Sequence, residues 1–582
     1  MPQPGTSPAP AELPARSATE AVEAFERYNA EFRAITRRAP VRFDERDWHG
    51  SQRDAVERIE LYSGYVDRTV AGLRIALGHV ALDRDLWRLI KDEFARRIAD
   101  LPDAEFRKTF FNSITRRFFD TVGVAPEIEF VALDLDPLAR VADYDFMVSY
   151  ANRGSLRLLF EEVLSAFRCK SPWRDFDRSV QHIAEEVERR CAALGERREV
   201  LRVEMIRPAF YQMTRAYLVG RVVGRDWHVP LAIAVKNTER GVLVDAVMTH
   251  DDDLSALFSF TRSYFHVDLE RVGKALLFLK QMMPHKPVSE LFTVLGRAKQ
   301  GKTERYRELF RHLASTADRF VNAPGETGLV MVVFTLPSFD VVFKLIRDQF
   351  PVQKNILRSD VRRKYELVFK HDRAGRLVDA QEFKQLRFPR DRFAPELLEE
   401  LLTRTALTAH ADGDDLIIGH CYVERRMTPL NLYLRAATAE QARQAVLDYG
   451  QAIRDLARSN IFPGDLLLKN FGVTRTGRVI FYDYDELCLV TDCRFRDLPQ
   501  TESYEDEMRA DAWFYVADND VFPETFINFL GFADDIKRVF LDAHGEILSA
   551  NWWRHVQQRL RADELVEVLP YAPHRVRVAS SL

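Results

Sequence analysis

The stretch Phe462-Pro-Gly-Asp-Leu-Leu-Leu-Lys-Asn-Phe-Gly-Val473 decides how the C-terminal half of this 582-residue chain folds. It follows a helix-like segment, and its Pro-Gly turn leads to Asp465 and, five residues on, to Asn470. The strand-like run VIFY then delivers Asp483, eighteen residues after Asp465. Catalytic groups are usually carried by loops that a rigid scaffold positions. We therefore expect a functional site where this loop and this strand end meet.

A glycine turn and a lysine lie upstream of this stretch. Residues 323–328, APGETG, precede the strand-like run LVMVVF, and Lys344 lies sixteen residues beyond Gly328. A glycine turn lets the backbone approach phosphate oxygens closely, and a lysine from a neighbouring element supplies a point charge to them. Four features therefore follow one another along the chain: a glycine turn, a lysine, an Asp-x4-Asn loop and an aspartate after a strand. Protein kinases have the same order of phosphate cover, phosphate-binding lysine, catalytic base and metal ligands. This order predicts a bilobal, protein-kinase-like domain.

The pattern departs from that of standard protein kinases in several places. His-Arg-Asp is replaced by PGD at 463–465, Asp-Phe-Gly is replaced by DYD at 483–485, and the loop lysine, Lys469, comes directly before the asparagine. The phosphate cover is shortened to the turn at 325–328. Spacing alone does not identify the helix glutamate that normally pairs with the lysine. The glutamates that remain open for this role are Glu366, Glu382 and Glu396.

Composition places the chain among ordinary globular proteins. Hydrophobic residues make up 46% and charged residues 30%, and the formal net charge is −4. No whole-chain positive field exists to hold a nucleic-acid backbone or an anionic membrane, so we expect neither as a partner. The most apolar short run, Leu329–Phe334, is far below the ~20 residues of a membrane-spanning helix. Residues 1–20 lack the basic and apolar regions of a secretory signal, and we expect a cytoplasmic protein.

Periodicity divides the chain into three parts. Residues 1–20 are rich in Pro and Ala and predict a disordered tail. Residues 21–318 are mostly helical, with apolar residues at helical spacing, and contain a small antiparallel sheet. Residues 319–582 hold the kinase-like pattern, and the predicted fold class is α+β. The sheet is predicted from three β-rich runs separated by turns: AYLVGRVV (216–223), HVPLAIAV (228–235) and GVLVDAVM (241–248).

Two further motifs have a functional and a structural interpretation. GRAKQGKT, residues 296–303, matches G-x-x-x-x-G-K-[ST], in which Lys302 would reach phosphates. The preceding VSELFTVL is at least as helical as strand-like, which favours a connection between two helices. His-Asp-Asp-Asp at 250–253 suits a divalent ion, but adjacent residues seldom converge on one ion, and a helix N-cap is the simpler interpretation.

The five cysteines are an odd number and include no CxxC spacing. A disulfide framework or a structural zinc site is therefore not expected, and a reducing compartment fits. Cys488 and Cys493 are close enough in sequence to be a redox pair, although idle thiols are the simpler interpretation.

Several long stretches resemble the isocitrate dehydrogenase kinase/phosphatase family, a group of bacterial bifunctional enzymes. They are AVKNTERGVLVDAVMTHDDDLSALFSFTRSYF, APGETGLVMVVFTLPSFDVVFK, HDRAGRLVDAQEF, ERRMTPLNLYL, GDLLLKNFGV and FYDYDEL, and the similarity covers nearly the whole chain after the tail. The resemblance implies an enzyme that phosphorylates a serine of isocitrate dehydrogenase and removes the same phosphate in an ATP- or ADP-requiring reaction. Such an enzyme controls carbon flow between the citric acid cycle and the glyoxylate bypass. The resemblance also implies a helical regulatory domain that responds to AMP, and it leaves a homodimer open.

The resemblance also implies roles for individual residues. Asp465 would accept the serine proton, Lys469 would act in the same loop, and Asp379 matches the position assigned to phosphatase activity. Mg²⁺ or Mn²⁺ would be held by Asn470 and Asp483, with Asp485 supporting the metal or a water. The residues implied in ATP or ADP binding are Ala323, Pro324, Gly325, Glu326, Thr327, Gly328, Leu329 and Lys344, with Glu424 and Met427 at the hinge beside adenine.

Two rival functions stay open at this point. One is a P-loop NTPase that uses Lys302, and the other is a catalytically inactive kinase-like scaffold that binds isocitrate dehydrogenase. The segment from Cys493 to about Phe529 carries aromatic residues amid acidic ones. We expect this segment either to dock the protein partner or to pack within the catalytic domain.

Overall fold

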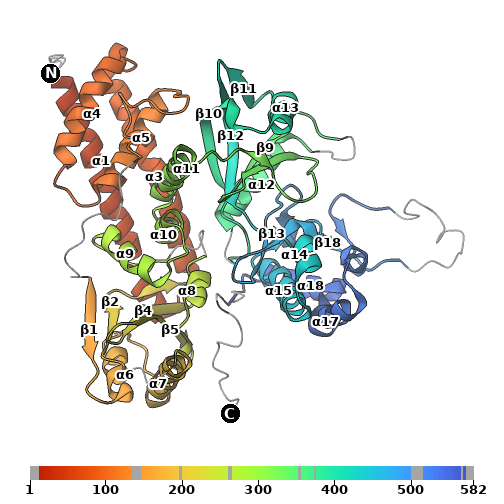
Figure 1. Ribbon diagram of the computed structural model, residues 1–582. Helices are drawn as coiled ribbons and strands as arrows, with labels where there is room; N and C mark the ends of the chain where they lie inside the picture. The colour runs from red at the N-terminus through yellow and green to blue at the C-terminus, as the bar shows by residue number, and fades with distance from the viewer. Residues whose placement is uncertain are drawn as a thin grey trace, which may run out of the picture. The chain divides into compact units, whose positions relative to one another are not determined.

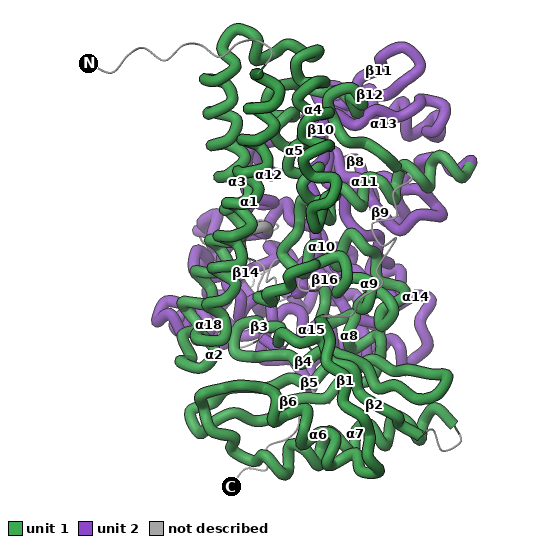
Figure 2. The backbone as a smooth tube through the Cα atoms, turned by 90° about the vertical axis from the view of Figure 1, so that its left-hand side faces the viewer, with its two compact units in different colours: residues 1–316, 571–582 green, residues 317–570 purple. Residues whose placement is uncertain are grey.

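The computed structural model divides the chain into two compact units. Unit 1 comprises Met1–Thr316 and Tyr571–Leu582, and unit 2 comprises Ala317–Pro570 (Figure 2). Each unit has its own buried core. The structure describes residues 12–133, 146–195, 199–259, 265–351, 356–371, 375–499, 515–564, 568–569 and 571.

The first part of unit 1 is a helical bundle (Figure 1). Its helices are α1 (Leu13–Thr36), α2 (Ala39–Glu45), α3 (Trp48–Leu77), α4 (Arg84–Ile98) and α5 (Ala104–Phe118), with a 3-10 turn η2 (Gly78–Val80). Apolar side chains at helical spacing form the core, and Phe25, Tyr28 and Phe32 of α1 are all buried there. α1 packs on both α3 and α4. The helical character predicted for this part of the chain is confirmed.

α1 begins earlier than the sequence pattern predicts. The composition of residues 1–20 predicts a tail, but α1 begins at Leu13. A proline occupies its first turn, where the backbone N–H has no intrahelical partner to lose. Ser17, Ala18 and Ala21 are buried. Alanine favours helix, and small side chains allow close packing, so a composition typical of linkers forms a packed helix here.

A six-stranded antiparallel sheet follows the bundle. Its strands are β1 (Met147–Ala151), β2 (Arg202–Ile206), β3 (Phe210–Gln212), β4 (Arg215–Val223), β5 (His228–Thr238) and β6 (Gly241–Met248). The strand order is β1-β2-β4-β5-β6, with β3 paired to β4. Helices α6 (Leu156–Ser165) and α7 (Phe176–Ala193) pack apolar residues against this sheet (Figure 1). The three predicted β-rich runs are the neighbouring strands β4, β5 and β6, so the predicted sheet is confirmed.

Helices resume after the sheet and contain the P-loop-like motif. They are α8 (Asp251–Leu257), α9 (Val272–Met282), α10 (Val288–Val294) and α11 (Ala298–Ser315). The motif joins α10 to α11, and Lys302 lies inside α11. A P-loop follows a strand, so a helix in that place does not provide the phosphate-binding geometry. A side chain at Gly301 would collide with the Ser289 carbonyl of α10, which shows that this glycine serves close helix packing.

The His-Asp-Asp-Asp run begins α8. His250 occupies the N-cap position, and the aspartates 251–253 form the first turn. Acidic side chains there face the partial positive charge of the helix N-terminus. Among the residues that the structure describes, no group of three or more His, Cys, Asp or Glu side chains is arranged to hold a metal ion. The run therefore begins a helix, but its aspartates lie in the first turn and not at the N-cap position that was predicted for them.

Unit 2 begins with a second six-stranded antiparallel sheet. Its strands are β7 (Val321–Asn322), β8 (Met331–Leu336), β9 (Phe339–Ile346), β10 (Gln381–Pro389), β11 (Ala409–Asp412) and β12 (Asp415–Arg425). Their order is β10-β12-β9-β8-β7, with β11 paired to β12. The helices of this half are α12 (Arg358–His371) and α13 (Pro395–Arg404), and η3 (Arg390–Arg392) is a 3-10 turn. The strand-like run LVMVVF, residues 329–334, lies mostly in β8.

The second half of unit 2 is mainly helical. Its helices are α14 (Leu430–Ala436), α15 (Ala439–Arg458), α17 (Asp534–His544) and α18 (Ala550–Arg561), with 3-10 turns η4 (Leu468–Asn470), η5 (Val490–Asp492), η6 (Pro523–Phe529) and η7 (Gly545–Leu548). The short strands are β13 (Thr428–Pro429), β14 (Ile461–Phe462), β15 (Phe471–Val473), β16 (Val479–Phe481), β17 (Cys488–Leu489), β18 (Arg494–Phe495) and β19 (Asp520–Val521). A sheet-rich half followed by a helical half confirms the predicted bilobal α+β fold. Residues 500–514 of the predicted docking segment lie outside the described residues.

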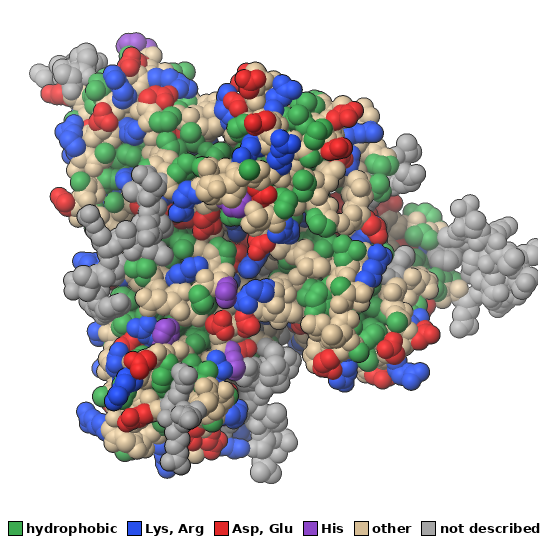
Figure 3. All heavy atoms as spheres, viewed as in Figure 1, with side chains coloured by type: hydrophobic (Ala, Val, Ile, Leu, Met, Phe, Trp, Pro, Cys, Tyr) green, Lys and Arg blue, Asp and Glu red, His purple; other side chains and the backbone are tan. Residues whose placement is uncertain are grey.

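The surface carries charges of both signs. Figure 3 shows basic and acidic side chains interspersed over the face in view, in keeping with a net charge of −4. In the described part of the chain, no helix combines the length and the apolar character needed to span a bilayer.

A buried arginine ties the two halves of unit 2 together. Arg376 forms ion pairs with Asp448 (2.7 Å) and Asp455 (2.9 Å), both on α15, and also donates to the Val479 carbonyl of β16. The next residue, Leu377, forms a β-bridge with Phe481. The ion pairs therefore fix residues 376–378 beside β16, the strand that precedes Asp483.

Replacing this arginine should destabilise unit 2. Arg376→Met would leave Asp455, only 3% exposed, as a buried charge without its cation. Removing one partner of a buried pair destabilises by about 3–5 kcal/mol. Urea unfolding followed by circular dichroism should show the lower midpoint. Arg387→Met is the matched control, because its partners Asp412 and Asp415 lie at the surface. Equal midpoints for the two variants would contradict the assignment.

Candidate active site

Lys344 is a buried cation held by two partners. It lies on β9 and is 5% exposed. Its Nζ lies 2.8 Å from Oε2 of Glu424 and donates to the Tyr482 carbonyl at 2.7 Å. Glu424 is on the neighbouring strand β12, whose register pairs Tyr422 with Lys344. Burial raises the pKa of Glu424, and the Lys344 charge opposes that shift. The lysine predicted to bind phosphates is thus fixed between the sheet and the helical half.

The carboxylate that pairs with Lys344 comes from a strand. Lys344 pairs with Glu424 and not with one of the three glutamates that sequence spacing leaves open. Of these three, Glu366 is on α12, Glu382 contacts His420 (3.0 Å), and Glu396 is in the first turn of α13. Glu424 was predicted only as a hinge residue. One signal in the sequence does point to it: an acidic residue closes the otherwise apolar run LIIGHCYV, where an isolated buried charge needs a partner.

The Asp-x4-Asn loop brings its two polar residues into contact. Asn470 Nδ2 donates to Asp465 Oδ1 at 2.5 Å, and the Leu467 N–H donates to the same oxygen at 3.1 Å. The 3-10 turn η4 carries Asn470 back toward Asp465. Gly464 precedes the aspartate with φ +91°, and a side chain there would collide with Glu486. The turn therefore requires glycine.

Several carboxylates crowd together behind this loop. Asp483 follows β16, and its pKa is raised first by burial and then by the charge of Asp485, with which it shares a hydrogen bond. The charge of Asp465 adds to the upward shift, and Lys344 opposes it. A cation placed here would relieve the repulsion. Hard oxygen donors suit Mg²⁺, which usually binds one or two protein carboxylates and completes its shell with phosphates and waters.

Asp379 lies close to this cluster. The Val378 N–H donates to the Phe481 carbonyl (3.2 Å), and the Tyr484 hydroxyl donates to the Val378 carbonyl (2.7 Å). Asp379 accepts a hydrogen bond from Gln381 at 3.1 Å, and its charge contributes to raising the pKa of Glu424. The residue that spacing alone did not identify is therefore brought to the surroundings of Lys344.

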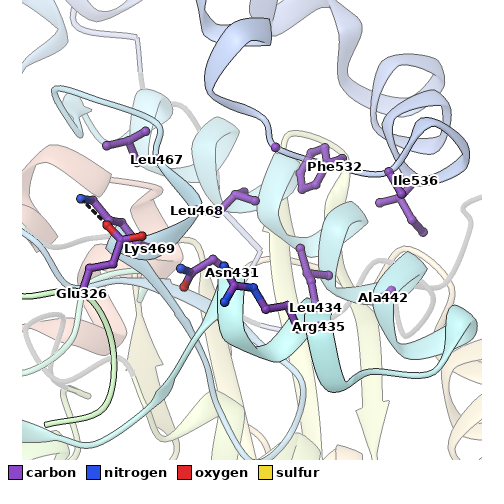
Figure 4. Close-up of a pocket in the computed structure, with 12 residues that line it drawn as sticks. Glu326, Asn431, Leu434, Arg435, Ala442, Leu467, Leu468, Lys469, Phe532 and Ile536 are labelled. Atoms are coloured by element: carbon purple, nitrogen blue, oxygen red, sulfur yellow. Dashed lines mark hydrogen bonds and ion pairs between the residues drawn. The ribbon is translucent and has the colours of Figure 1, made fainter.

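The glycine turn meets the catalytic loop through one ion pair. Lys469 Nζ lies 2.9 Å from Oε2 of Glu326, and both side chains are partly exposed (Figure 4). Gly325 has φ +127°, a conformation that glycine adopts without strain. The other predicted turn residues Pro324, Thr327 and Leu329 are exposed. At the link between the two halves, Met427 packs closely on Gly472. A side chain at position 472 would collide with Met427.

A cavity of about 450 Å³ opens beside this ion pair. Figure 4 shows Glu326 and Lys469 on one side of it and Phe532 and Ile536 on the other. Its walls are mostly apolar, and Arg435 adds a second cation. The cavity adjoins the loop that carries Asp465, since Leu467, Leu468 and Lys469 line it. The lining residues are Glu326, Asn431, Leu434, Arg435, Ala442, Leu467, Leu468, Lys469, Gly531, Phe532, Ala533 and Ile536.

The fold and the site together define a protein-kinase-like phosphotransferase. Residues 318–573 match the family model described as the isocitrate dehydrogenase kinase/phosphatase (AceK) kinase domain, and residues 18–317 match that of the regulatory domain. The chain therefore belongs to the isocitrate dehydrogenase kinase/phosphatase family.

Proteins named isocitrate dehydrogenase kinase/phosphatase are similar to this chain along nearly their whole length. The protein of Anaeromyxobacter sp. (strain Fw109-5) is 47% identical over 562 residues, which cover 97% of this chain and 98% of the relative. The protein of Xanthomonas euvesicatoria pv. vesicatoria (strain 85-10) is 49% identical over 558 residues, 95% of this chain and 96% of the relative. The family resemblance seen in the sequence is confirmed.

The carboxylate cluster predicts how the chain responds to a divalent cation. At a pH above the raised pKa of Asp483, about 8, Asp483→Asn should raise the melting temperature without metal, because it removes a repelling charge. Mg²⁺ with ADP at about 100 times its Kd should raise the melting temperature of unit 2 in the wild type by about 5–10 °C, and the variant should gain less than half of that.

The measurement is differential scanning fluorimetry with and without Mg²⁺ and ADP. Asp414→Asn, at an exposed hairpin position, should behave as the wild type. An equal response of the Asp483 variant and the wild type would exclude Asp483 as a ligand.

Proposed function

We propose that this chain transfers the γ-phosphoryl group of ATP to a serine of isocitrate dehydrogenase and removes the same phosphate at one shared site. The observation that carries the proposal is Lys344, a buried ammonium group anchored by Glu424 and the Tyr482 carbonyl beside Asp483. The names of the relatives, which are similar over at least 95% of this chain, supply the protein substrate. Such an enzyme controls carbon flow between the citric acid cycle and the glyoxylate bypass.

Phosphoryl transfer requires positioning and charge stabilisation more than covalent chemistry. Lys344 stabilises negative charge on the nucleotide phosphates, and the turn at residues 323–329 covers them. Glu424–Met427 borders adenine at the link between the two halves. Asn470 and Asp483, with Asp485, would hold Mg²⁺ or Mn²⁺, which when bound neutralises charge on the phosphates.

Asp465 is the base of the kinase reaction. Its Oδ1 is occupied by the amide of Asn470 and the N–H of Leu467, which fixes the orientation of the carboxylate. The carboxylate of Asp465 accepts the serine proton as the serine oxygen attacks phosphorus. Lys469, four residues on, carries positive charge at the mouth of the adjoining cavity, where the acceptor loop of a folded protein enters.

The phosphatase reaction uses the same nucleotide site with a different acceptor. Asp379 orients the group that receives the phosphate, either ADP or water, and the ion pairs of Arg376 hold it in place. The helical unit 1 regulates the two reactions and takes AMP as its effector. The enzyme acts in the cytoplasm, where both substrates occur.

A pair of lysine variants tests the nucleotide site. Lys344→Met should lower transfer of labelled phosphate from ATP to isocitrate dehydrogenase by about 10²–10³-fold, because a preorganised charge is lost. Lys302→Met should leave transfer unchanged, since this lysine lies inside α11. The reverse result would support the P-loop alternative, and a wild type without transfer would support the inactive scaffold.

Two aspartate variants separate the two reactions. The Asp379→Asn variant should no longer remove phosphate from phosphorylated isocitrate dehydrogenase, but it should retain most of the kinase rate. Asp465→Asn should lower the kinase rate by about 10²–10⁴-fold, the usual contribution of a general base. Both rates are measured with labelled phosphate on the same preparations. Equal loss of both reactions in the Asp379 variant would contradict this division of roles.

A further inference from the structure

We propose that Cys488 and Cys493 are a modification site, which a hydroperoxide oxidises to an intramolecular disulfide. We propose further that this disulfide lowers the rate of phosphoryl transfer at the neighbouring catalytic loop. The two Sγ atoms lie 3.5 Å apart. Neither thiol takes part in the phosphoryl transfer proposed above. The disulfide itself can be detected whether or not that transfer occurs.

The backbone between the two cysteines is held in a tight turn. Cys488 is in β17, and the 3-10 turn η5 reverses the chain so that Cys493 faces it. Gln557 of α18 donates to the carbonyls of both Val490 and Cys493, each at 2.7 Å. The Thr491 N–H donates to Asn460 Oδ1 at 3.0 Å. Both ends of the turn are therefore fixed from outside.

This fixed turn leaves little movement for bond formation. A disulfide has an S–S distance of about 2.05 Å, so the two sulfurs need to approach by about 1.5 Å. Rotation of the two side chains can supply much of this approach. The loss of conformational freedom on cross-linking is small, because only four residues separate the two cysteines and these already form a folded turn.

The two thiols differ in a way that suits stepwise oxidation. Cys488 is half-buried and Cys493 is buried. The hydrogen bond between them lowers the pKa of Cys488, and the charge of Lys364 lowers it further. Burial and the charges of Asp492 and Glu486 oppose this shift. The same hydrogen bond raises the pKa of Cys493. Cys488 is thus the thiol that reacts first, since the thiolate is the nucleophile.

The reaction balances with one peroxide per disulfide. The Cys488 thiolate attacks a peroxide oxygen and the O–O bond breaks. The leaving oxygen takes a proton from solvent, equal to the one that the thiol released on ionising, and departs as water or alcohol. Cys493 then attacks the sulfenic sulfur, the S–O bond breaks, and the hydroxyl group leaves as water with the Cys493 proton. The two sulfurs together lose two electrons, and the peroxide gains them.

The pair is connected to the catalytic loop by strand pairing. β17 pairs with β14, and Cys488 is the register partner of Phe462, three residues before Asp465. The segment between Asp483 and Cys488 also packs against Gly464 through Glu486. A cross-link that draws Cys488 toward η5 therefore pulls on the strand that leads into the loop.

The disulfide is tested by digestion and mass spectrometry of the full chain. After treatment with hydrogen peroxide and blocking of free thiols, cleavage before Asp485, Asp492 and Asp497 yields the peptides 485–491 and 492–496. These peptides remain joined only through a Cys488–Cys493 disulfide. We expect the joined species in the wild type and in Cys169→Ser, the matched control. Cys488→Ser and Cys493→Ser should each abolish it.

Two results would overturn the proposal. The disulfide would be excluded if both thiols could still be alkylated after peroxide treatment. It would also be excluded if Cys488 were oxidised to the sulfinic acid and no joined peptide were found. The rate of labelled phosphate transfer should fall at least threefold in the oxidised wild type, recover with dithiothreitol, and stay constant in Cys493→Ser. A fully oxidised chain with an unchanged rate would exclude the effect on the loop.

Discussion

The catalytic unit depends on one buried positive charge. The pKa of Asp483 is raised by the nearby charges of Asp485 and Asp465. Lys344 opposes that shift, and it also forms an ion pair with Glu424. Charges in a poorly solvated site interact strongly, so the arrangement is tolerable only because this ammonium group is present. The site is thus built with excess negative charge, which favours a partner that brings cations with it. A nucleotide accompanied by a divalent metal ion is such a partner.

Much of this site is local in sequence and could be predicted. Asp465 and Asn470 are five apart in one turn, and Asp483 follows a short strand of β-branched and aromatic residues. Helix α15 and the strands β4, β5 and β6 also follow from their periodicity. In each case the spacing within a single segment determines which side chains share a face.

The remainder depends on contacts between distant segments. Glu424 reaches Lys344 only because β12 pairs with β9 in one register, and no spacing rule carries that information across 80 residues. Asp379 is positioned by the ion pairs of Arg376 with α15, and the two cysteines approach through a turn that α18 holds. The start of α1 differs from the prediction because Pro- and Ala-rich composition describes both linkers and closely packed helices.

The strand origin of the lysine's partner restricts how such an enzyme can be switched. Many protein kinases turn off by swinging a helix outward, which carries its glutamate away from the lysine. Here both residues of the salt link belong to adjacent strands of one sheet, and separating them would mean unzipping backbone hydrogen bonds. The contact between Lys344 and Glu424 therefore does not depend on the position of a helix. Control over two opposing reactions then has to come from what is admitted to the active centre rather than from assembling and dismantling it.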